Sequence, residues 1–343
     1  MMSKKEINIC LVNTVYSLFL YFLIEGYNEN DIFIFTSYMP NEISDNIECI
    51  RLPHVAFVDG FRMDSLNSVK GIINNVLGYC RYFYGYFKLR ILLFIKTFNK
   101  KVKVYGHAHT PFSYMFYENE NSNVIEDGLM NYSWEVYKTH KINPVVDMIL
   151  HLCGVYFLSA HEGLGSHVNI KNVYLTQENN DPLIKDKVKI IDIKKRWESI
   201  PVNERNKIMS IFNINIDSLS FNEKTVLILT GAFYNDNLLS YDEEVNIYGD
   251  MIRKFENYTI LIKPHPRDTI NYKEIFNGVE VLDRTFPIEI LTTIGFKPNV
   301  VCAIVSTALL NFKESEIYIY EGEIKNKEVS ALRDTLVDMV NKK

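Results

Sequence analysis

Hydrophobic and polar residues alternate along the N-terminal half of the chain in a pattern typical of an α/β protein. Short apolar runs predict strands, and longer segments with apolar residues every three or four positions predict helices. The predicted strands are Ile7–Val12, Ile32–Thr36, Lys101–Tyr105, Asn123–Ile125 and Val155–Leu158, and the predicted helices are Val15–Ile24, Val69–Tyr82, Tyr84–Thr97 and Asn143–Leu152.

The C-terminal part alternates more cleanly. Strands are predicted at Val226–Leu229, Tyr258–Ile262, Val279–Leu282, Val300–Val305 and Ile317–Tyr320, and helices at Asp242–Phe255, Pro287–Thr292, Ala308–Phe312 and Val329–Val340. Between about residues 175 and 220 the pattern weakens into polar and charged runs, which indicates a linker region with one helix near Asn203–Ile211. The pattern predicts two Rossmann-like domains, residues 1–184 and 185–343, with parallel sheets facing across a central cleft. Functional residues are expected just after the strands, where ligands bind in such sheets.

The first apolar segment, Ile7–Ile24, has no charged residue over 18 positions, close to the length of a membrane-spanning helix. Polar residues interrupt it and no small-residue cleavage site follows, so a strand and a helix are the better interpretation. We therefore expect the protein to work inside the cell.

Composition narrows the class of protein. The chain has 343 residues, of which 47% are hydrophobic and 13% aromatic, and this excludes a disordered chain. Its 37 basic and 42 acidic residues exclude a strongly basic nucleic-acid-binding protein. Five scattered cysteines form neither a disulfide framework nor a zinc motif, as expected for a cytoplasmic protein. They are Cys10, Cys49, Cys80, Cys153 and Cys302.

The net charge of −5 conceals an uneven distribution. The segment Ser65–Tyr117 has no acidic residue and carries eight basic ones, from Lys70 to Lys103, together with many aromatic residues. Such a segment can lie on an anionic membrane surface or meet an anionic glycolipid. The alternative is a pair of amphipathic helices on an ordinary domain, with lysine stems covering apolar surface.

A histidine between two prolines and two cations is the most specific motif in the chain. Lys263-Pro264-His265-Pro266-Arg267 follows the predicted strand Tyr258–Ile262. The prolines fix the backbone around His265, and the two cations attract an anion such as phosphate. His265 could therefore protonate a phosphate leaving group.

Two further strand ends in the C-terminal half carry candidate ligand-binding residues. Ser306 and Thr307 open a helix after Val300–Val305, which offers hydroxyls and free N–H groups to an anion. Glu289 follows Val279–Leu282 and could bond the hydroxyls of a ribose. Each pattern alone is also that of an ordinary helix start.

Candidate bases and acceptor-side residues follow other strands. Glu126-Asp127-Gly128 follows Asn123–Ile125 and could place a carboxylate in the cleft as a general base, although an acidic turn is an equal alternative. Asp236, shortly after Gly231, could be the base from the other side. His107 and His109 could line the acceptor side; without a third ligand at useful spacing, they do not predict a metal site.

Several absent motifs limit the possible chemistry. The sequence has no dinucleotide-binding glycine fingerprint, no P-loop, no serine-nucleophile elbow and no Asp-x-Asp triplet. A nucleotide-sugar enzyme with this sequence would therefore handle phosphate with cations and helix ends instead of a bound metal.

The ordered motifs resemble those of bacterial sialyltransferases, and most closely glycosyltransferase family 52, which includes lipooligosaccharide and capsule sialyltransferases. They are Glu126-Asp127-Gly128, Lys263-Pro264-His265-Pro266-Arg267, Pro287-x-Glu289 and Ser306-Thr307. The resemblance is strongest from about residue 224 to 320, and the His-Pro motif is its specific part.

The resemblance implies a two-domain GT-B fold and metal-independent transfer of sialic acid, with inversion, from CMP-sialic acid to a galactose-terminated glycan. His265 would be the general acid. Ser306 and Thr307 would hold the phosphate, Glu289 the ribose and Lys263 the nucleotide, with Gly231, Pro266 and Arg267 also on the donor side. The resemblance leaves two possibilities for the general base, which are Glu126 or Asp127 on one side and Asp236 on the other. A GT-B enzyme for another activated sugar and a non-catalytic glycan- or membrane-binding protein are the alternatives. An α-2,3 linkage, peripheral membrane contact and a homodimer are further expectations.

Overall fold

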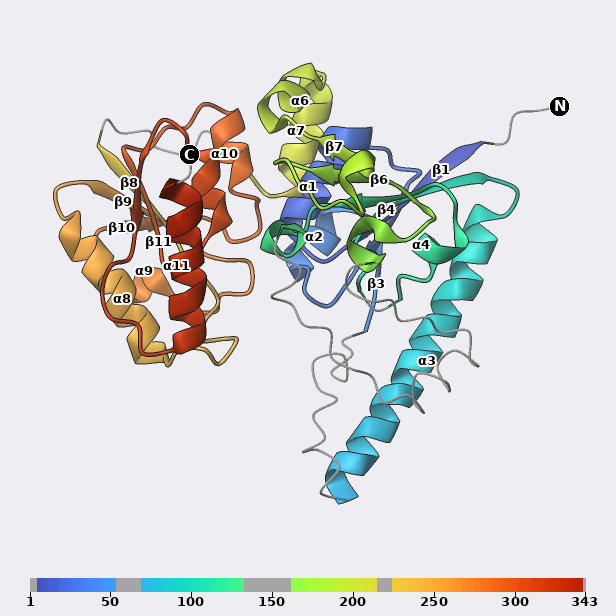
Figure 1. The fold of residues 1–343 in the computed structure, drawn as a ribbon, viewed down its shortest axis with the longest axis horizontal. Helices are drawn as coiled ribbons and strands as arrows, with labels where there is room; N and C mark the ends of the chain where they lie inside the picture. The colour runs from blue at the N-terminus through green and yellow to red at the C-terminus, as the bar shows by residue number, and fades with distance from the viewer. Residues whose placement is uncertain (1–4, 54–68, 111, 133–161, 215–223, 342–343) are drawn as a thin grey trace. The chain divides into compact units, whose positions relative to one another are not determined.

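The computed structural model describes residues 5–53, 69–110, 112–132, 162–214 and 224–341 (Figure 1). The chain divides into two compact units. The first comprises Met1–Met39 with Ile47–Asp192, and the second Pro40–Asn46 with Ile193–Lys343. The main boundary falls at Asp192, whereas the sequence pattern places it at residue 184, and the short segment Pro40–Asn46 joins the second unit.

The first unit is built on a parallel sheet. Seven strands of the described residues form it in the order β3-β2-β1-β4-β5-β6-β7, and every neighbouring pair is parallel. Their bounds are β1 Glu6–Val12, β2 Ile32–Phe35, β3 Cys49–Arg51, β4 Lys101–Gly106, β5 Ser122–Ile125, β6 Ile170–Leu175 and β7 Val188–Ile190.

Helices cover both faces of this sheet. The described helical segments are α1 Val15–Glu25, α3 Val69–Thr97, α4 Met115–Glu118, η2 Gly128–Asn131, η4 Glu162–Ser166 and η5 Lys185–Lys187. Alternate residues of a strand point to opposite faces. Ile32 and Ile34 of β2 pack in one core cluster with Tyr86 of α3, while Phe33, between them, makes an edge-to-face contact with Tyr21 of α1. The all-apolar strands thus have an apolar partner on each side, as parallel sheets require.

Helix α3 is longer than the sequence pattern predicts. We expected two helices, Val69–Tyr82 and Tyr84–Thr97, but one helix of 29 residues runs through both, so the predicted break is wrong. The segment contains no proline to stop a helix. Gly85 lies inside the helix at a point of close contact, because a Cβ there would come within 3.2 Å of Pro53 and 3.3 Å of Phe112. The glycine therefore permits close packing and does not end the helix.

The predicted linker region is largely ordered structure. It contains β7, α6 Ile193–Ser199 and α7 Val202–Ile211, the last of which confirms the helix expected near Asn203–Ile211. Trp197 of α6 and Ile208 of α7 are buried. Each element buries few residues, which is why its apolar signal is weak in the sequence.

The second unit has a five-stranded parallel sheet in the order β10-β9-β8-β11-β12. The strands are β8 Thr225–Leu229, β9 Thr259–Lys263, β10 Val279–Val281, β11 Val300–Ala303 and β12 Glu316–Ile319. The described helical segments, besides α6 and α7, are α2 Asn41–Asn46, α8 Tyr241–Lys254, α9 Tyr272–Ile275, α10 Glu289–Thr293, η7 Thr307–Asn311 and α11 Lys327–Asn341. These strands confirm the five predicted ones to within a few residues.

The second unit's core lies on both sides of its sheet. Val226 and Ile228 pack with Tyr248 of α8 and Val329 of α11. Leu227, which points to the opposite face, is also fully buried. The predicted helix Asn143–Leu152 and strand Val155–Leu158 lie outside the described residues. Across the described ranges, we find no helix that combines the length and apolarity needed to cross a membrane.

Candidate active site

The carboxyl ends of four neighbouring strands meet at one edge of the second unit's sheet. Because β10, β9, β8 and β11 are adjacent and parallel, the segments that leave them lie on the same edge. These segments carry the predicted donor-side residues, which are Gly231, Asp236, Lys263, Pro266, Arg267, Glu289, Ser306 and Thr307, together with His265. The fold therefore brings this group to one region.

His265 is held in a defined tautomer at the end of β9. Its backbone N–H donates to Thr230 Oγ1 at 3.0 Å. Its Nδ1 accepts the backbone N–H of Arg267 at 3.2 Å, so Nδ1 carries no proton and Nε2 does. Burial, with the charges of Arg267 and Lys263, lowers the pKa of His265 to about 3. The imidazole is therefore neutral and keeps an N–H to offer.

A buried network outside the predicted site residues supports this histidine. Asp268 accepts hydrogen bonds from Thr230 Oγ1 at 2.5 Å and from the Tyr272 hydroxyl at 2.8 Å. Burial raises the pKa of Asp268 in spite of these donors. Asp268 thus holds Thr230, and Thr230 holds the backbone of His265. The position of Asp268 directly after the Lys-Pro-His-Pro-Arg motif was the available signal.

Arg267 and Asp236 form a bidentate ion pair. The guanidinium nitrogens lie 2.5 and 3.0 Å from the two carboxylate oxygens, and the side chains are partly exposed. This pair joins the loop after β8 to the loop after β9. Asp236 is therefore already neutralised by the cation that sits two residues from His265.

Lys263 lies beneath the loop and is buried. Its Nζ donates to the carbonyl oxygens of Pro264 at 2.9 Å and Arg284 at 3.2 Å, and lies 4.8 Å from the centre of the Phe286 ring. Burial lowers the pKa of Lys263 to about 7, although Asp283 and Glu289 oppose the shift. In this arrangement Lys263 holds the backbone that precedes His265.

The other donor-side candidates lie where their strand ends place them. Glu289 is the buried first residue of α10 and accepts a hydrogen bond from Asn311 at 3.2 Å. Ser306 precedes η7 in an extended conformation, and Thr307 is its first residue. The backbone N–H of Gly231 donates to the hydroxyl of Tyr248 at 2.7 Å, and a Cβ at this position would lie 2.2 Å from the Phe233 ring.

The first unit gathers its predicted residues at the carboxyl ends of β4 and β5. His107 and His109 follow β4, and Glu126, Asp127 and Gly128 follow the neighbouring β5. Gly106 ends β4 with φ of +120°, and a Cβ there would lie 1.8 Å from the Leu11 carbonyl oxygen. Only glycine fits this close approach to β1, which directs the chain toward His107.

His107 and Glu126 are both committed to structure. His107 is fully buried; its Nδ1 accepts the N–H of Asn13 at 3.2 Å and its Nε2 lies 2.8 Å from Ser17 Oγ. Burial lowers the pKa of His107 to about 4, so it is neutral. Glu126 is buried and accepts four hydrogen bonds, from the Tyr16 and Tyr132 hydroxyls and from the N–H and hydroxyl of Thr176. Its remaining capacity to take a proton from a substrate is small.

Asp127 is the better placed of the two adjacent acids. Its Oδ2 lies 3.1 Å from Nε2 of His109, and its backbone N–H donates to Asn131 Oδ1 at 2.6 Å. Burial opposes ionisation, but the imidazoles of His107 and His109 outweigh it and lower the pKa of Asp127 to about 2. Nδ1 of His109 is buried and has no hydrogen-bond partner within the described part of the chain. Asp127 and His109 therefore form a carboxylate–imidazole pair in which Nδ1 of the imidazole is left without a partner in this part of the structure.

These residues suit acid–base and anion chemistry. In the described ranges, no three His, Cys, Asp or Glu side chains cluster closely enough to hold a metal ion. The second unit combines a neutral histidine with the Arg267 cation and with a buried lysine of lowered pKa, and the first offers an ionised carboxylate.

Several solved structures share this architecture. An α/β-galactoside α-2,3-sialyltransferase from Photobacterium phosphoreum aligns with a TM-score of 0.51 and 12% identity, covering 96% of each chain. A 2,6-sialyltransferase from another Photobacterium, solved with CMP and lactose, aligns with a TM-score of 0.59 and 10% identity over 98% of this chain and 76% of its own. The GT-B domain of a Photobacterium damselae sialyltransferase aligns with a TM-score of 0.54 and 11% identity over 98% and 96%. The fold class is thus that of the GT-B glycosyltransferases, as predicted.

The sequence itself gives the family. The profile of glycosyltransferase family 52 matches residues 78–327, and the chain belongs to this family. An uncharacterized protein of Haemophilus influenzae is 28% identical over 245 residues, which cover 69% of this chain and 76% of its own. The family predicted from the motifs is confirmed, and the protein is a glycosyltransferase.

Proposed function

We propose that the protein is an inverting sialyltransferase that moves sialic acid from CMP-sialic acid to a galactose-terminated glycan. The geometry of His265 carries the proposal, because a loop with two cations presents its Nε2–H at the carboxyl edge of a parallel sheet. Family membership and the sialyltransferase fold of the solved relatives support it. The 2,6-sialyltransferase among them was solved with CMP and lactose, which are the product and acceptor expected here.

In the proposed reaction, an acceptor hydroxyl attacks the anomeric carbon of sialic acid, and the bond from that carbon to the phosphate oxygen breaks. The electron pair leaves on CMP, His265 supplies a proton to the phosphate, and a carboxylate takes the proton of the hydroxyl. Arg267 and Lys263 supply positive charge near the phosphate, and Ser306 and Thr307 supply hydroxyl and N–H donors. Glu289 takes the ribose. We propose that these groups act without a metal ion.

The base is assigned to Asp127 or Asp236, with Glu126 the weakest candidate because its oxygens are already bonded. Asp127→Asn, Asp236→Asn and Glu126→Gln distinguish them. The variant of the true base should lose about 10²–10⁴ in kcat for transfer to lactose, while its affinity for CMP stays within a few-fold. Asp236→Asn should also weaken CMP binding if its main task is to orient Arg267. If all three variants keep full turnover, the base is none of these residues.

Incubation with CMP-sialic acid, lactose and EDTA tests the function. We expect sialyllactose to form, and a linkage-specific sialidase then tests the proposed bond to the 3-hydroxyl. His265→Asn is the matched variant, because its side-chain oxygen can still accept the Arg267 N–H while the acid is gone. It should lose about 10²–10⁴ in kcat. If the folded protein shows no transfer and no donor hydrolysis, the proposal is contradicted.

Two alternatives give different results in the same assays. An enzyme for another CMP-linked sugar would be stabilised by CMP in thermal unfolding but would not transfer sialic acid. A non-catalytic binding protein would not be stabilised by CMP.

The natural acceptor that we propose is a lipooligosaccharide or capsular glycan. The enzyme, which we propose is a homodimer, would meet this acceptor at the cytoplasmic face of the membrane. The uneven charge of the chain supports this location.

A further inference from the structure

Helix α3 has a second apolar face that is exposed. Tyr82, Tyr86, Leu89 and Leu93 pack into the first unit's core. On the other side, large apolar residues recur every three or four positions and so lie along one face of the helix. Their exposed fractions are 71% for Tyr84, 48% for Phe87, 63% for Ile91, 67% for Phe94 and, just beyond the helix, 69% for Phe98. A continuous stripe of this kind marks an interaction surface.

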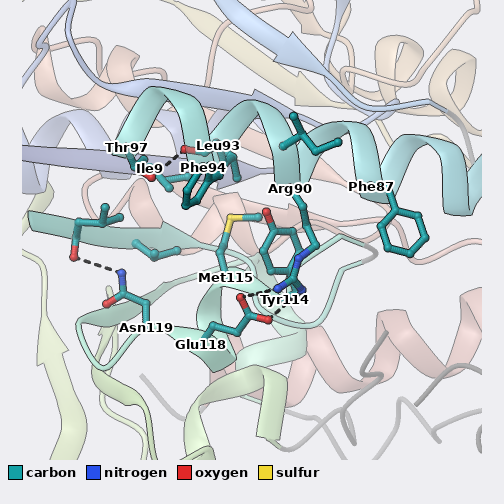
Figure 2. Close-up of a pocket in the computed structure, with 13 residues that line it drawn as sticks. Ile9, Phe87, Arg90, Leu93, Phe94, Thr97, Tyr114, Met115, Glu118 and Asn119 are labelled. Atoms are coloured by element: carbon teal, nitrogen blue, oxygen red, sulfur yellow. Dashed lines mark hydrogen bonds and ion pairs between the residues drawn. The ribbon is translucent and has the colours of Figure 1, made fainter. Parts of the chain in front are cut away.

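A cavity of about 540 Å³ opens beside this stripe. Figure 2 shows Phe87 and Phe94 of α3 among the residues that line it, together with Met115 and Tyr114 from the segment after β4. Its floor is apolar and buried and includes Ile9 and Val104 of the sheet. The volume lies within the range of about 300–1,000 Å³ of small-molecule sites.

Polar groups are confined to a few positions of the lining. Arg90 pairs with Glu118 at 2.8 Å, and its guanidinium lies 4.6 Å from the centre of the Tyr114 ring (Figure 2). Both charged side chains are partly exposed, whereas Leu93 and Met115 are buried. A ligand with a long apolar part and a polar end matches this distribution.

Two exposed basic residues flank the stripe. Arg81 and Lys88 are exposed on α3, seven residues apart and on the flank of the stripe. They belong to the segment Ser65–Tyr117, which has eight basic residues and no acidic one. Four of the eight pair with acids outside the segment, namely Arg90 with Glu118, Lys96 with Glu48, and Lys101 and Lys103 with Glu6, so the charge that flanks the stripe is that of Arg81 and Lys88. A basic flank beside exposed aromatic and aliphatic residues is the composition of helices that lie in an anionic membrane interface.

We propose that α3 docks on an anionic phospholipid membrane and that the cavity takes one acyl chain of a membrane phospholipid. The stripe enters the interface, Arg81 and Lys88 contact the headgroups, and the chain occupies the space between α3, β4 and α4. The inference rests on the proposed function for its purpose, since a glycolipid acceptor lies in such a membrane.

Vesicle co-sedimentation of the full-length protein tests the docking. We expect binding to phosphatidylcholine vesicles with about one third phosphatidylglycerol, and a reduction of at least about tenfold in the partition coefficient for the double variant I91S and F94S. Both residues are exposed, so folding should persist. The matched control is V168S and L183S, which removes two apolar residues of the first unit that lie outside α3 and are 84% and 61% exposed, and it should bind as the unchanged protein does. Replacing Arg81 and Lys88 by serine should cost about fivefold per residue.

Filling the cavity separates chain binding from surface docking. Thr97 lines the cavity at the end of α3, and Thr97→Phe should fill part of it while keeping the exposed stripe and adding no tryptophan that the vesicles could quench. We expect this variant to lose quenching of its protein fluorescence by vesicles with bromine on the acyl chains, relative to Thr97→Ser. Equal quenching in both variants would overturn the acyl-chain site.

The outcomes also separate this inference from the proposed function. Transfer to soluble lactose should be unchanged in I91S and F94S, because the stripe takes no part in the chemistry. If lactose transfer proceeds but the double variant I91S and F94S binds vesicles as the control variant does, the docking inference fails and the proposed function stands. If the unchanged protein binds no vesicles and this variant converts a dimer to a monomer in light scattering, the stripe is an interface between two copies instead.

Discussion

The hydrogen bond at Nδ1 of His265 fixes what this residue can do at rest. Because Nδ1 accepts the Arg267 N–H, the neutral ring can donate only through Nε2. Burial and two neighbouring cations keep it neutral, with a pKa of about 3. A bound phosphate would place negative charge beside Nε2 and favour the imidazolium form. To act as a general acid, His265 must therefore take up a proton from solvent when the donor binds.

Binding of CMP should accordingly take up a proton. At pH 6 the donor-free His265 is neutral, and a raised pKa in the complex should bring uptake of up to about one proton. Calorimetry of CMP binding in two buffers of different ionisation enthalpy measures this number, and His265→Asn should reduce it to that of the remaining groups. Equal uptake in both proteins would mean that His265 stays neutral and only donates a hydrogen bond.

Thr230 positions His265 without touching the substrate in our proposal. Thr230→Val should leave the His265 N–H without its partner and remove a donor from Asp268, at a cost of about 1–3 kcal/mol in the free energy of unfolding. We expect kcat to fall by about tenfold or more with little change in the KM for lactose. Thr230→Ser keeps the hydroxyl and should restore kcat, which a purely structural role for the methyl group would not allow.

At the scale of the elements, the sequence predicted the buried strands that consist of a continuous apolar run. The runs at β1, β8 and β11 were found because both faces of a parallel strand are covered. The strands β3, β6 and β7 were missed. β3 and β7 have three residues each and are incompletely buried, and β6 alternates buried residues with exposed and half-buried ones. The hydrogen bond between Thr230 and Asp268 could not be predicted, because the two residues are 38 positions apart and meet only through the pairing of β8 with β9.

Gly106 is the sharpest test of how β4 delivers its histidines. Gly106→Ala places a Cβ against the Leu11 carbonyl oxygen at φ of +120°. We expect a loss of about 3 kcal/mol or more in the free energy of unfolding by urea. Gly78→Ala is the control, because no atom lies within 4 Å of its added Cβ in α3, and it should stabilise the protein by up to about 1 kcal/mol. Equal effects would show that the close approach to β1 relaxes readily.

At the scale of the whole molecule, a buried histidine that stays neutral lies near the candidate chemistry of each unit. His107 has a pKa lowered to about 4 and His265 one lowered to about 3, both from 6.5. The unfolded chain binds more protons than the native one in this window, so each histidine makes the protein less stable as pH falls below about 6.5. Glu244 acts in the opposite direction. Burial raises its pKa from 4.5 to about 7, so its contribution to stability is lost as pH rises toward 7.

The contribution of His265 can be isolated from these opposing groups by difference. We expect its part of the free energy of unfolding to fall by up to about 1.4 kcal/mol per pH unit between pH 6.5 and 4. Urea unfolding at pH 7.5, 5.5 and 4.5 should thus give a shallower pH dependence for His265→Asn than for the unchanged protein, while His107 and Glu244 contribute equally to both. Saturating CMP should flatten the curve of the unchanged protein alone, because a phosphate that raises the pKa of His265 removes the same proton difference. Parallel curves for the two proteins would show that His265 has an ordinary pKa in the fold. Donor binding would then need no proton uptake by His265.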